Sequence, residues 1–453
     1  MPNLKFCLTF LSVCLAELNA GMFLGWTSPI TPRLLDHDFS FKITANEACW
    51  TVCVFTLGMA CGCFLSIFLL DIVGRKVLIL LTIFPSSVSW MLMLWSPSIS
   101  NLYVSRFIGG TASGIIFTSG SIYVTEISPP HIRSALCSCF LLMNYCGSFL
   151  GYVLTSIGTI EKYSYVGMFL VMLQFIVFAW MPESPFYLLR RKRFGAGMDS
   201  LMYMRNSADV AEELDSIMKS VESDSQYNGT ISSIFHLASE KGGKRVILIG
   251  ANLMTLQVFS GTIILITYSR TIFEKIDNVQ LPGTYISIVL PIVFLMSYLL
   301  CISLVDRLGR KPLIIVSTVG VASCSFLLGI YFFLEQKNLD TSGFQPFAFG
   351  VALLYVISVS LGLASVPFVV MNEIFPMYAK AACVGLGFCV NFIWSFIILR
   401  IWSTVVFANS IHIGFWLFSG FNVFSIFFLV FYLPETKGQF LQISDSSVGR
   451  IKK

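Results

Sequence analysis

Long apolar runs dominate this sequence, and they limit its fold more than any other feature. We find about twelve of them, each holding roughly the 20 apolar residues that an α-helix needs to cross a bilayer. A helix satisfies its own backbone hydrogen bonds in hydrocarbon, so each run predicts one spanning helix. The predicted helices cover residues 5–30, 49–70, 77–96, 101–124, 134–158, 163–181, 246–270, 283–304, 312–334, 346–370, 381–406 and 411–433.

The polar composition excludes several classes of protein. Only 12% of the 453 residues are charged, against about 25% in soluble globular proteins. The thirteen cysteines fall almost entirely inside apolar runs, and pairs such as Cys61 and Cys63 point to different helix faces, which does not suit a metal site. There is no P-loop or nucleophile elbow. We therefore expect a membrane protein that is not an enzyme, with no cofactor and no nucleic-acid partner.

Basic residues predict the orientation in the membrane. Short loops on the cytosolic side carry an excess of Lys and Arg. If the N-terminus is cytosolic, the residues that gather on that side are Arg75, Lys76, Arg133, the run 190–193, Arg310, Lys311, Lys380 and Lys437. The first apolar run is too long for the core of a signal peptide. We predict that both termini face the cytosol, and we expect the membrane to be the plasma membrane.

An internal repeat divides the chain. The stretch LDIVGRK at 70–76 returns as VDRLGRK at 305–311, half a chain later. Two further pairs occur in the same order: EISPPHIR at 126–133 with EIFPMYAK at 373–380, and PES at 182–184 with PET at 434–436. Matched halves of this kind are a transporter architecture. The predicted divisions are a six-helix half at 1–182, a cytosolic linker with amphipathic helices at 183–245, a second six-helix half at 246–433 and a cytosolic tail at 434–453.

Taken together, these motifs resemble the sugar porter family of the major facilitator superfamily. The ordered set of D-x-x-G-R-K, PES, EIFP and PETKG carries the resemblance over nearly the whole chain, and GWTSPITPRL at 25–34 is similar to the arthropod facilitated trehalose transporters. The resemblance implies an all-α membrane protein with twelve helices in two pseudo-symmetric bundles. It also implies a facilitative carrier of a hexose or a disaccharide such as trehalose, working by alternating access.

The resemblance further implies a cytosolic gate. A single exposed ion pair contributes only about 0–1 kcal/mol, so a gate needs a network of charges. Topology and folding alone are the alternative role for these residues. Lys380 stands where the family usually has Arg, and Lys cannot form the two-pronged contact with a carboxylate. The network would join Arg75, Glu126 and Arg133 of the first half to Arg310, Glu373 and Lys380 of the second.

A sugar site needs amides and hydroxyls together with an aromatic face. By resemblance, Gln257 and Asn391 stand at family binding amides, Phe368 replaces a tryptophan, and Tyr268 matches a tyrosine-rich helix end. Pro367 is expected to interrupt the tenth helix. Helix packing is the alternative role for these side chains. Several family amides are replaced by apolar residues, which would weaken hexose binding unless the solute differs; these positions are Leu141, Val258, Ile263 and Phe294.

Ionisable residues inside the apolar runs are functional candidates. Glu17 lies in the middle of the first helix and could couple transport to protons, whereas proton-coupled relatives usually carry an Asp where this chain has Thr27. Arg106, near the start of the fourth helix, is expected near an interface, and Arg400 is expected to reach outward. The alternatives to a facilitative carrier are a proton–sugar symporter and a non-transporting sugar sensor. The expected partners are a small sugar and the lipid bilayer, and the oligomeric state is left open.

Overall fold

The computed structural model describes residues 4–30, 43–95, 98–129, 132–207, 209–224, 230–240, 242–276, 283–337, 339, 342–407 and 410–435. Most of the predicted tail at 434–453 lies outside these residues. Every regular element among them is a helix. Eleven helices in this part of the chain are long and apolar enough to cross a membrane, and Val289–Val305 forms a shorter apolar helix.

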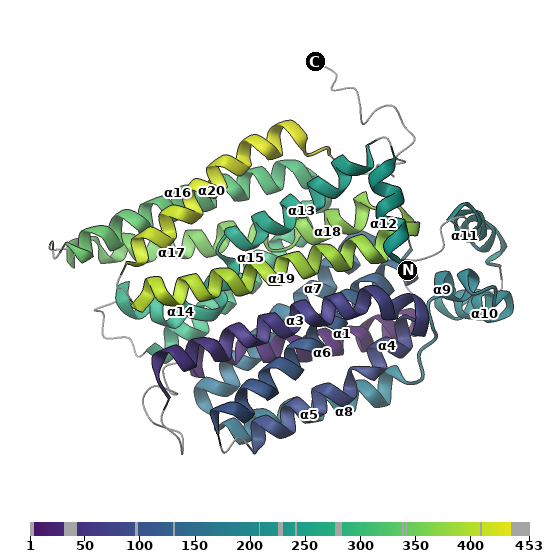
Figure 1. Ribbon diagram of the computed structural model, residues 1–453, viewed down its shortest axis with the longest axis horizontal. Helices are drawn as coiled ribbons and strands as arrows, with labels where there is room; N and C mark the ends of the chain where they lie inside the picture. Colours follow the sequence, from purple (N-terminus) through teal and green to yellow (C-terminus); the bar gives the residue numbers. More distant parts are fainter. Residues whose placement is uncertain are drawn as a thin grey trace.

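The helices form two halves that lie side by side along the long axis of the molecule (Figure 1). The first half consists of α1 (Leu4–Gly25), α3 (Ala45–Val73), α4 (Arg75–Leu81), α5 (Ile83–Leu94), α6 (Ile99–Ile127), α7 (Arg133–Ile157) and α8 (Ile160–Phe178). The second half consists of α13 (Gly243–Phe259), α14 (Thr262–Ile276), α15 (Gly283–Leu308), α16 (Arg310–Gln336), α17 (Gln345–Ser358), η3 (Val359–Leu363), α18 (Val366–Ile374), α19 (Met377–Phe407) and α20 (Ile411–Tyr432). The halves meet where α3 packs along α19 and where α7 packs along α15.

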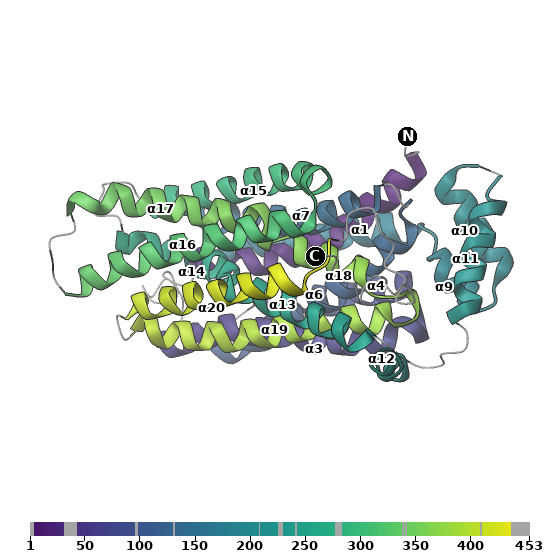
Figure 2. The same ribbon diagram turned by 90° about the horizontal axis from the view of Figure 1, so that it is seen from above.

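Four further helices lie at one end of the two halves (Figures 1 and 2), which we call the linker end. They are α9 (Pro185–Arg190), α10 (Phe194–Arg205), α11 (Ala211–Asp224) and α12 (Thr230–Ser239). The apolar side of α11 carries Leu214, Ile217, Met218 and Val221 at helical spacing, as the sequence predicts. These side chains pack with Leu189 and Leu201 of α9 and α10, so α9, α10 and α11 form a small core of their own. The fourth helix, α12, packs against α13 and α19 instead.

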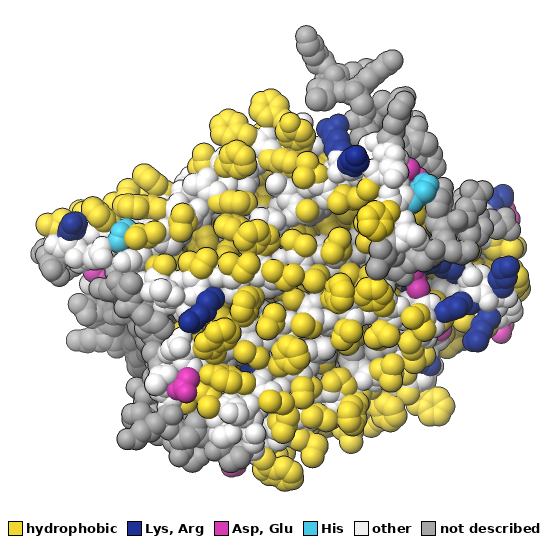
Figure 3. Space-filling model, in the orientation of Figure 1, with side chains coloured by type: hydrophobic (Ala, Val, Ile, Leu, Met, Phe, Trp, Pro, Cys, Tyr) yellow, Lys and Arg dark blue, Asp and Glu magenta, His cyan; other side chains and the backbone are white. Residues whose placement is uncertain are grey.

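On the face shown in Figure 3, hydrophobic side chains cover the middle and charged side chains lie mostly towards the two ends. Inside each half, glycines allow helices to approach closely. A Cβ at Gly110 of α6 would overlap the carbonyl of Phe55, and a Cβ at Gly58 of α3 would overlap that of Phe107. Small residues play this role in membrane helices because lipid offers no hydrophobic drive for association. The pattern suits a protein surrounded by a bilayer.

Candidate substrate site and gates between the two halves

The seventh spanning helix is interrupted beside the centre of the molecule. It ends as α13 at Phe259 and restarts as α14 at Thr262, and Gly261 between them has φ +78°, which a glycine adopts readily. The carbonyl of Phe259 accepts a hydrogen bond from Asn422 Nδ2 (2.9 Å), and that of Ser260 accepts one from the Tyr355 hydroxyl (2.7 Å). The interruption is stable in hydrocarbon because both freed carbonyls find a partner.

The tenth spanning helix is interrupted as well. After α17 the chain forms the π-helical turn η3, and α18 begins at Val366. The sequence predicts that Pro367 interrupts this helix. Pro367 in fact lies in the first turn of α18, where its missing N–H costs nothing. The irregular turn lies upstream, and the backbone N–H of Leu363 donates to Ser317 Oγ (3.1 Å) across to α16.

Two of the predicted substrate residues meet directly. Asn391 of α19 donates through Nδ2 to Gln257 Oε1 (2.8 Å) and to the carbonyl of Met254 (2.9 Å) on α13. Both amide side chains are buried, and Gln257 lies just before the interruption of its helix. The structure therefore joins two residues far apart in the sequence into one amide pair next to a broken helix. A pair of this kind can exchange its mutual hydrogen bond for bonds to a bound hydroxyl.

Phe368, the third predicted residue, belongs to an aromatic cluster that spans the two halves. Phe117 of α6 makes edge-on contacts with Phe368 (ring centroids 5.4 Å apart), Phe388 (4.9 Å) and Phe392 (5.6 Å). Phe388 and Phe392 flank Asn391 on α19. Phe117 cannot be identified from the sequence, because one Phe in an apolar helix carries no signal of its own.

Tyr268, the fourth predicted residue, lies farther along α14, at the end of the molecule opposite the linker end. Its hydroxyl donates to Cys49 Sγ of α3 at 3.8 Å. Nearby on the same seam, Arg400 donates to Asn46 Oδ1 (2.8 Å) and its guanidinium lies 5.0 Å from the centre of the Trp50 ring. Tyr268 and Arg400 therefore join the two halves at this end. The structure does not bring Tyr268 into contact with the amide pair.

The gate residues of the first half form a buried ion pair at the linker end. Arg75 donates to Glu126 Oε1 from Nε (3.2 Å) and Nη2 (3.0 Å), and it also reaches Asp71 at 3.3 Å. The Ser184 hydroxyl donates to the other oxygen of Glu126. The PES segment, which follows the last spanning helix of the first half, thus contributes a hydrogen-bond donor to this charged cluster.

The gate residues of the second half repeat this arrangement with less burial. Arg310 Nη2 donates to Glu373 Oε1 at 2.9 Å, and the Glu373 side chain is 24% exposed. Lys380 is buried and interacts electrostatically with Arg133 and Glu126 of the other half as well as with Glu373. The two ion pairs lie within their own halves, and Lys380 interacts electrostatically with the carboxylate of each.

The glutamates of PES and PET have matching roles. Glu183 accepts from the backbone N–H of Lys76 (3.0 Å), and Glu435 accepts from those of Arg310 (3.0 Å) and Lys311 (3.1 Å). Each carboxylate thereby caps the first turn of a spanning helix, where N–H groups lack partners and negative charge is favoured. Burial raises the pKa of Glu183, and its backbone hydrogen bonds oppose that rise.

The contact between each carboxylate and its helix also explains why a glycine precedes each of these helices. Gly74 has φ +102° and Gly309 has φ +94°. A Cβ at Gly74 would lie 2.5 Å from Glu183 Oε2, and one at Gly309 would lie 2.8 Å from Glu435 Oε2. The D-x-x-G-R-K and P-E-S/T motifs are therefore two parts of one structural unit, present once in each half.

Glu17 is fully buried in α1. Its Oε1 accepts from Asn144 Nδ2 of α7 at 2.8 Å, and its Oε2 has no hydrogen-bond partner in the described structure. A buried carboxyl with one unsatisfied oxygen costs free energy unless it binds a proton or another ligand. The sequence marks Glu17 as a functional candidate, whereas nothing in it indicates that Asn144 is the partner of this carboxyl group.

Arg106, near the start of α6, is fully buried within the first half. Its guanidinium donates to Thr27 Oγ1 (3.1 Å) and to the carbonyl of Thr51 (3.3 Å). It also lies 4.3 Å from the Phe55 ring centre and 4.9 Å from the Trp26 ring centre. These partners of the Arg106 guanidinium are neutral. One of them, Thr27, occupies the position at which, by resemblance, proton-coupled relatives carry an acid.

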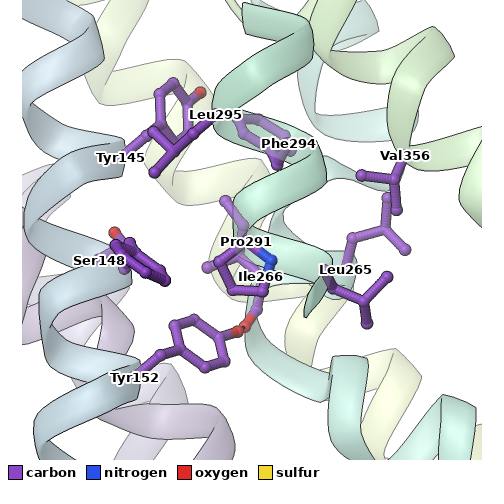
Figure 4. Close-up of a pocket in the computed structure, with 11 residues that line it drawn as sticks. Tyr145, Ser148, Tyr152, Leu265, Ile266, Pro291, Phe294, Leu295 and Val356 are labelled. Atoms are coloured by element: carbon purple, nitrogen blue, oxygen red, sulfur yellow. Dashed lines mark hydrogen bonds between the residues drawn. The ribbon is translucent and has the colours of Figure 1, made fainter. Parts of the chain in front are cut away.

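A cavity lies between the halves on the seam of α7 and α15 (Figure 4). It encloses about 450 Å³ of space free of protein atoms, part of it open to the surroundings. Its walls come from α7, α14, α15 and α17 and include Tyr145, Tyr152 and Phe294. None of the four predicted substrate residues lines this cavity.

Solved structures with the same arrangement define the class of protein. The proton:xylose symporter XylE bound to 6-bromo-6-deoxy-D-glucose aligns with a TM-score of 0.81 at 20% identity, covering 96% of this chain and 98% of that one. The inward-open xylose transporter XylE from E. coli gives a TM-score of 0.72 at 19% identity, covering 95% and 97%. The chain has the major facilitator fold, with two pseudo-symmetric six-helix bundles, as predicted.

Sequence comparison then places the chain in a family. Residues 10–446 match the family described as sugar (and other) transporter, and the chain belongs to that family. It is 28% identical over 451 residues to the facilitated trehalose transporter Tret1 of Aedes aegypti, covering 98% of this chain and 55% of that protein. It is 25% identical over 433 residues to the Tret1 of Bombyx mori, covering 95% and 84%. The chain spans about half the length of several of the curated relatives it matches.

Proposed function

We propose that this chain is a facilitative transmembrane sugar carrier, for a hexose or a disaccharide such as trehalose, that works by alternating access. The observation that carries the proposal is the buried Gln257–Asn391 pair, which lies beside an interrupted helix of the second half. Sites of this kind lie at the interface of structural repeats and at discontinuous helices. Membership of the sugar transporter family and the similarity to named trehalose transporters support a sugar as the solute.

Contacts at both ends of the interface support an alternating mechanism. At the end opposite the linker end, Arg400 binds Asn46 and Tyr268 binds Cys49. Towards the linker end, Phe117 packs against Phe368, and Lys380 lies near Glu126. An aromatic pair contributes about 0.5–1.5 kcal/mol beyond burial, so each set is weak enough to break. In the proposed cycle one set opens while the other holds, and the described structure is the occluded intermediate.

The polar capacity of the site limits its affinity. A sugar hydroxyl that replaces the Asn391–Gln257 bond gains about 0.5–1.5 kcal/mol for each net hydrogen bond. Leu141 and Phe294, by resemblance, stand at positions where relatives commonly carry amides, so fewer hydroxyls can be bound. We therefore expect weak binding, as suits a carrier that follows a concentration gradient.

We also propose that the linker end faces the cytosol and that the carrier works in the plasma membrane. The linker end carries Arg75, Arg190 and Arg310, and positive charge near spanning helices favours the cytosolic side. Both chain termini would then be cytosolic.

Uptake by proteoliposomes tests the carrier proposal. The purified chain is reconstituted and supplied with a panel of radiolabelled hexoses and disaccharides, with no ion gradient. We expect saturable uptake that Gln257→Ala reduces by about tenfold or more, the effect of losing roughly 1.4 kcal/mol. Gln174→Ala is the matched control, because Gln174 is a buried amide on α8, within its own half. Equal loss in both variants would contradict a substrate role for Gln257.

Proton–sugar symport is the second candidate, and the unsatisfied oxygen of Glu17 favours it. In that case an inward proton gradient drives sugar accumulation, and Glu17→Gln abolishes the accumulation while leaving exchange between equal pools. Sugar uptake that is the same with and without the proton gradient would exclude proton–sugar symport. Folded, reconstituted protein that moves no sugar, yet binds one, would instead indicate the sensor.

A further inference from the structure

The cavity on the α7–α15 seam has a composition that does not suit a sugar. Its three hydroxyl groups are already bound to backbone carbonyls: Tyr145 to Ala364 (3.3 Å), Ser148 to Gly21 (3.1 Å), and Tyr152 to Ile266. The rest of its wall is aliphatic or aromatic. A polar solute would lose its hydration there and gain few hydrogen bonds. The cavity therefore selects an apolar occupant.

The mouth of the cavity faces the lipid side of the molecule. Its rim includes Phe149 of α7 and Leu295 of α15, which are partly exposed, whereas Leu265 and Val356 at the inner wall are buried. Next to Leu295, the outer face of α15 exposes Met296 (63%) and other apolar side chains. In a membrane protein that face lies against acyl chains. The rim is thus continuous with the hydrocarbon of the bilayer.

We propose that the acyl chain of a membrane phospholipid enters this cavity from the bilayer and packs between the two halves. Most of the wall around this space is aliphatic or aromatic, which is the lining that an acyl chain requires. Burying an acyl chain against apolar walls gains contacts that an empty cavity would forfeit. This inference concerns lipid binding and does not depend on which solute the carrier moves.

Such a chain would act on the transport cycle. Its contacts with α7 belong to one half and its contacts with α14, α15 and α17 to the other. The cavity keeps this shape only while the halves hold their present arrangement, so a bound chain stabilises that arrangement over those in which the seam opens. Lipid composition would then tune the rate of the cycle.

Photo-crosslinking in nanodiscs tests the proposal directly. The full chain is reconstituted with a phosphatidylcholine that carries a diazirine on its acyl chain, irradiated, digested and mapped by mass spectrometry. We expect label at Leu265 and Val356, behind the rim. Leu295→Trp fills the mouth and is expected to lower that inner label by about tenfold. Ile292→Trp is the matched control, because Ile292 is on the same helix, exposed and outside the cavity lining.

Two results would overturn the proposal. One is label at exposed side chains such as Met296 with none at the inner wall of the unmodified protein. The other is an equal loss of inner label in Leu295→Trp and Ile292→Trp. If Leu295→Trp does not elute as a monodisperse protein, Phe149→Trp blocks the mouth from the α7 side instead. Because this experiment measures the site of crosslinking, its result does not depend on whether the protein transports sugar.

Discussion

The charged cluster of the first half is more deeply buried than its counterpart in the second. The side chains of Arg75 and Glu126 are 4% and 5% exposed, whereas Arg310 is 7% and Glu373 is 24% exposed. Glu126 also receives the Ser184 hydroxyl. The same sequence motif therefore yields two ion pairs of unequal environment. The difference teaches that the motif sets the backbone geometry, while the surrounding helices decide how much each pair contributes.

The largest expected effect comes from leaving one buried charge without its partner. Arg75→Ala should lower the free energy of unfolding by about 3–5 kcal/mol, because Glu126 stays buried. Arg310→Ala should cost less, about 1.5–3 kcal/mol, because water can reach Glu373. Thermal unfolding of the purified variants in one detergent measures both. An equal loss, or a larger loss for Arg310→Ala, would show that burial does not separate the clusters.

The glycines of the two motifs should behave alike, which sharpens the comparison. Gly74→Ala and Gly309→Ala both force a side chain into a glycine-only backbone conformation and against a capping carboxylate. Each should lower the free energy of unfolding by about 1–3 kcal/mol. Gly195→Ala is the control, because a Cβ there meets nothing within 4 Å. A clear difference between the two motif variants in thermal unfolding would contradict the matched roles of Glu183 and Glu435.

The smallest expected effect concerns closure at the linker end. Glu373→Gln removes a negative charge that faces Lys380 and should weaken closure by about 1 kcal/mol, the scale of one partly exposed pair. Cys137 reports on it, because this thiol is buried in α7 and interacts electrostatically with Lys380 and Glu373 of the other half. In a protein with Cys137 as its single cysteine, a polar maleimide should label this thiol several-fold faster when Glu373→Gln is present than when Glu373 is retained.

The exposed Glu212 on α11 supplies the control for that experiment. Glu212→Gln removes the same charge from the linker end at a distance from the gate, and should leave the labelling rate unchanged. Unchanged labelling in Glu373→Gln as well would remove Glu373 from the gate. Faster labelling in both variants would point to a general loss of packing instead.

Part of the site could be predicted from the sequence because it repeats. Motifs that recur in order in each half, together with the family resemblance, indicate a charged network that joins the halves. The structure instead pairs Arg75 with Glu126 and Arg310 with Glu373 within each half. Gln257 and Asn391 were identified by resemblance, yet their mutual hydrogen bond could not be foreseen. Phe117, Asn144 and Asn422 gave no signal, because a contact between distant helices leaves no spacing to detect within either one.

The sequence by itself determined the spanning helices, their two-fold repeat and the family. These features depend on local quantities: the length of each apolar run, the backbone freedom of a glycine and the order of short motifs. Only the tertiary structure decided which buried polar groups find partners, where the helices are interrupted and where a cavity remains. Those outcomes depend on how helices from different parts of the chain pack, and packing is set by all of their side chains together.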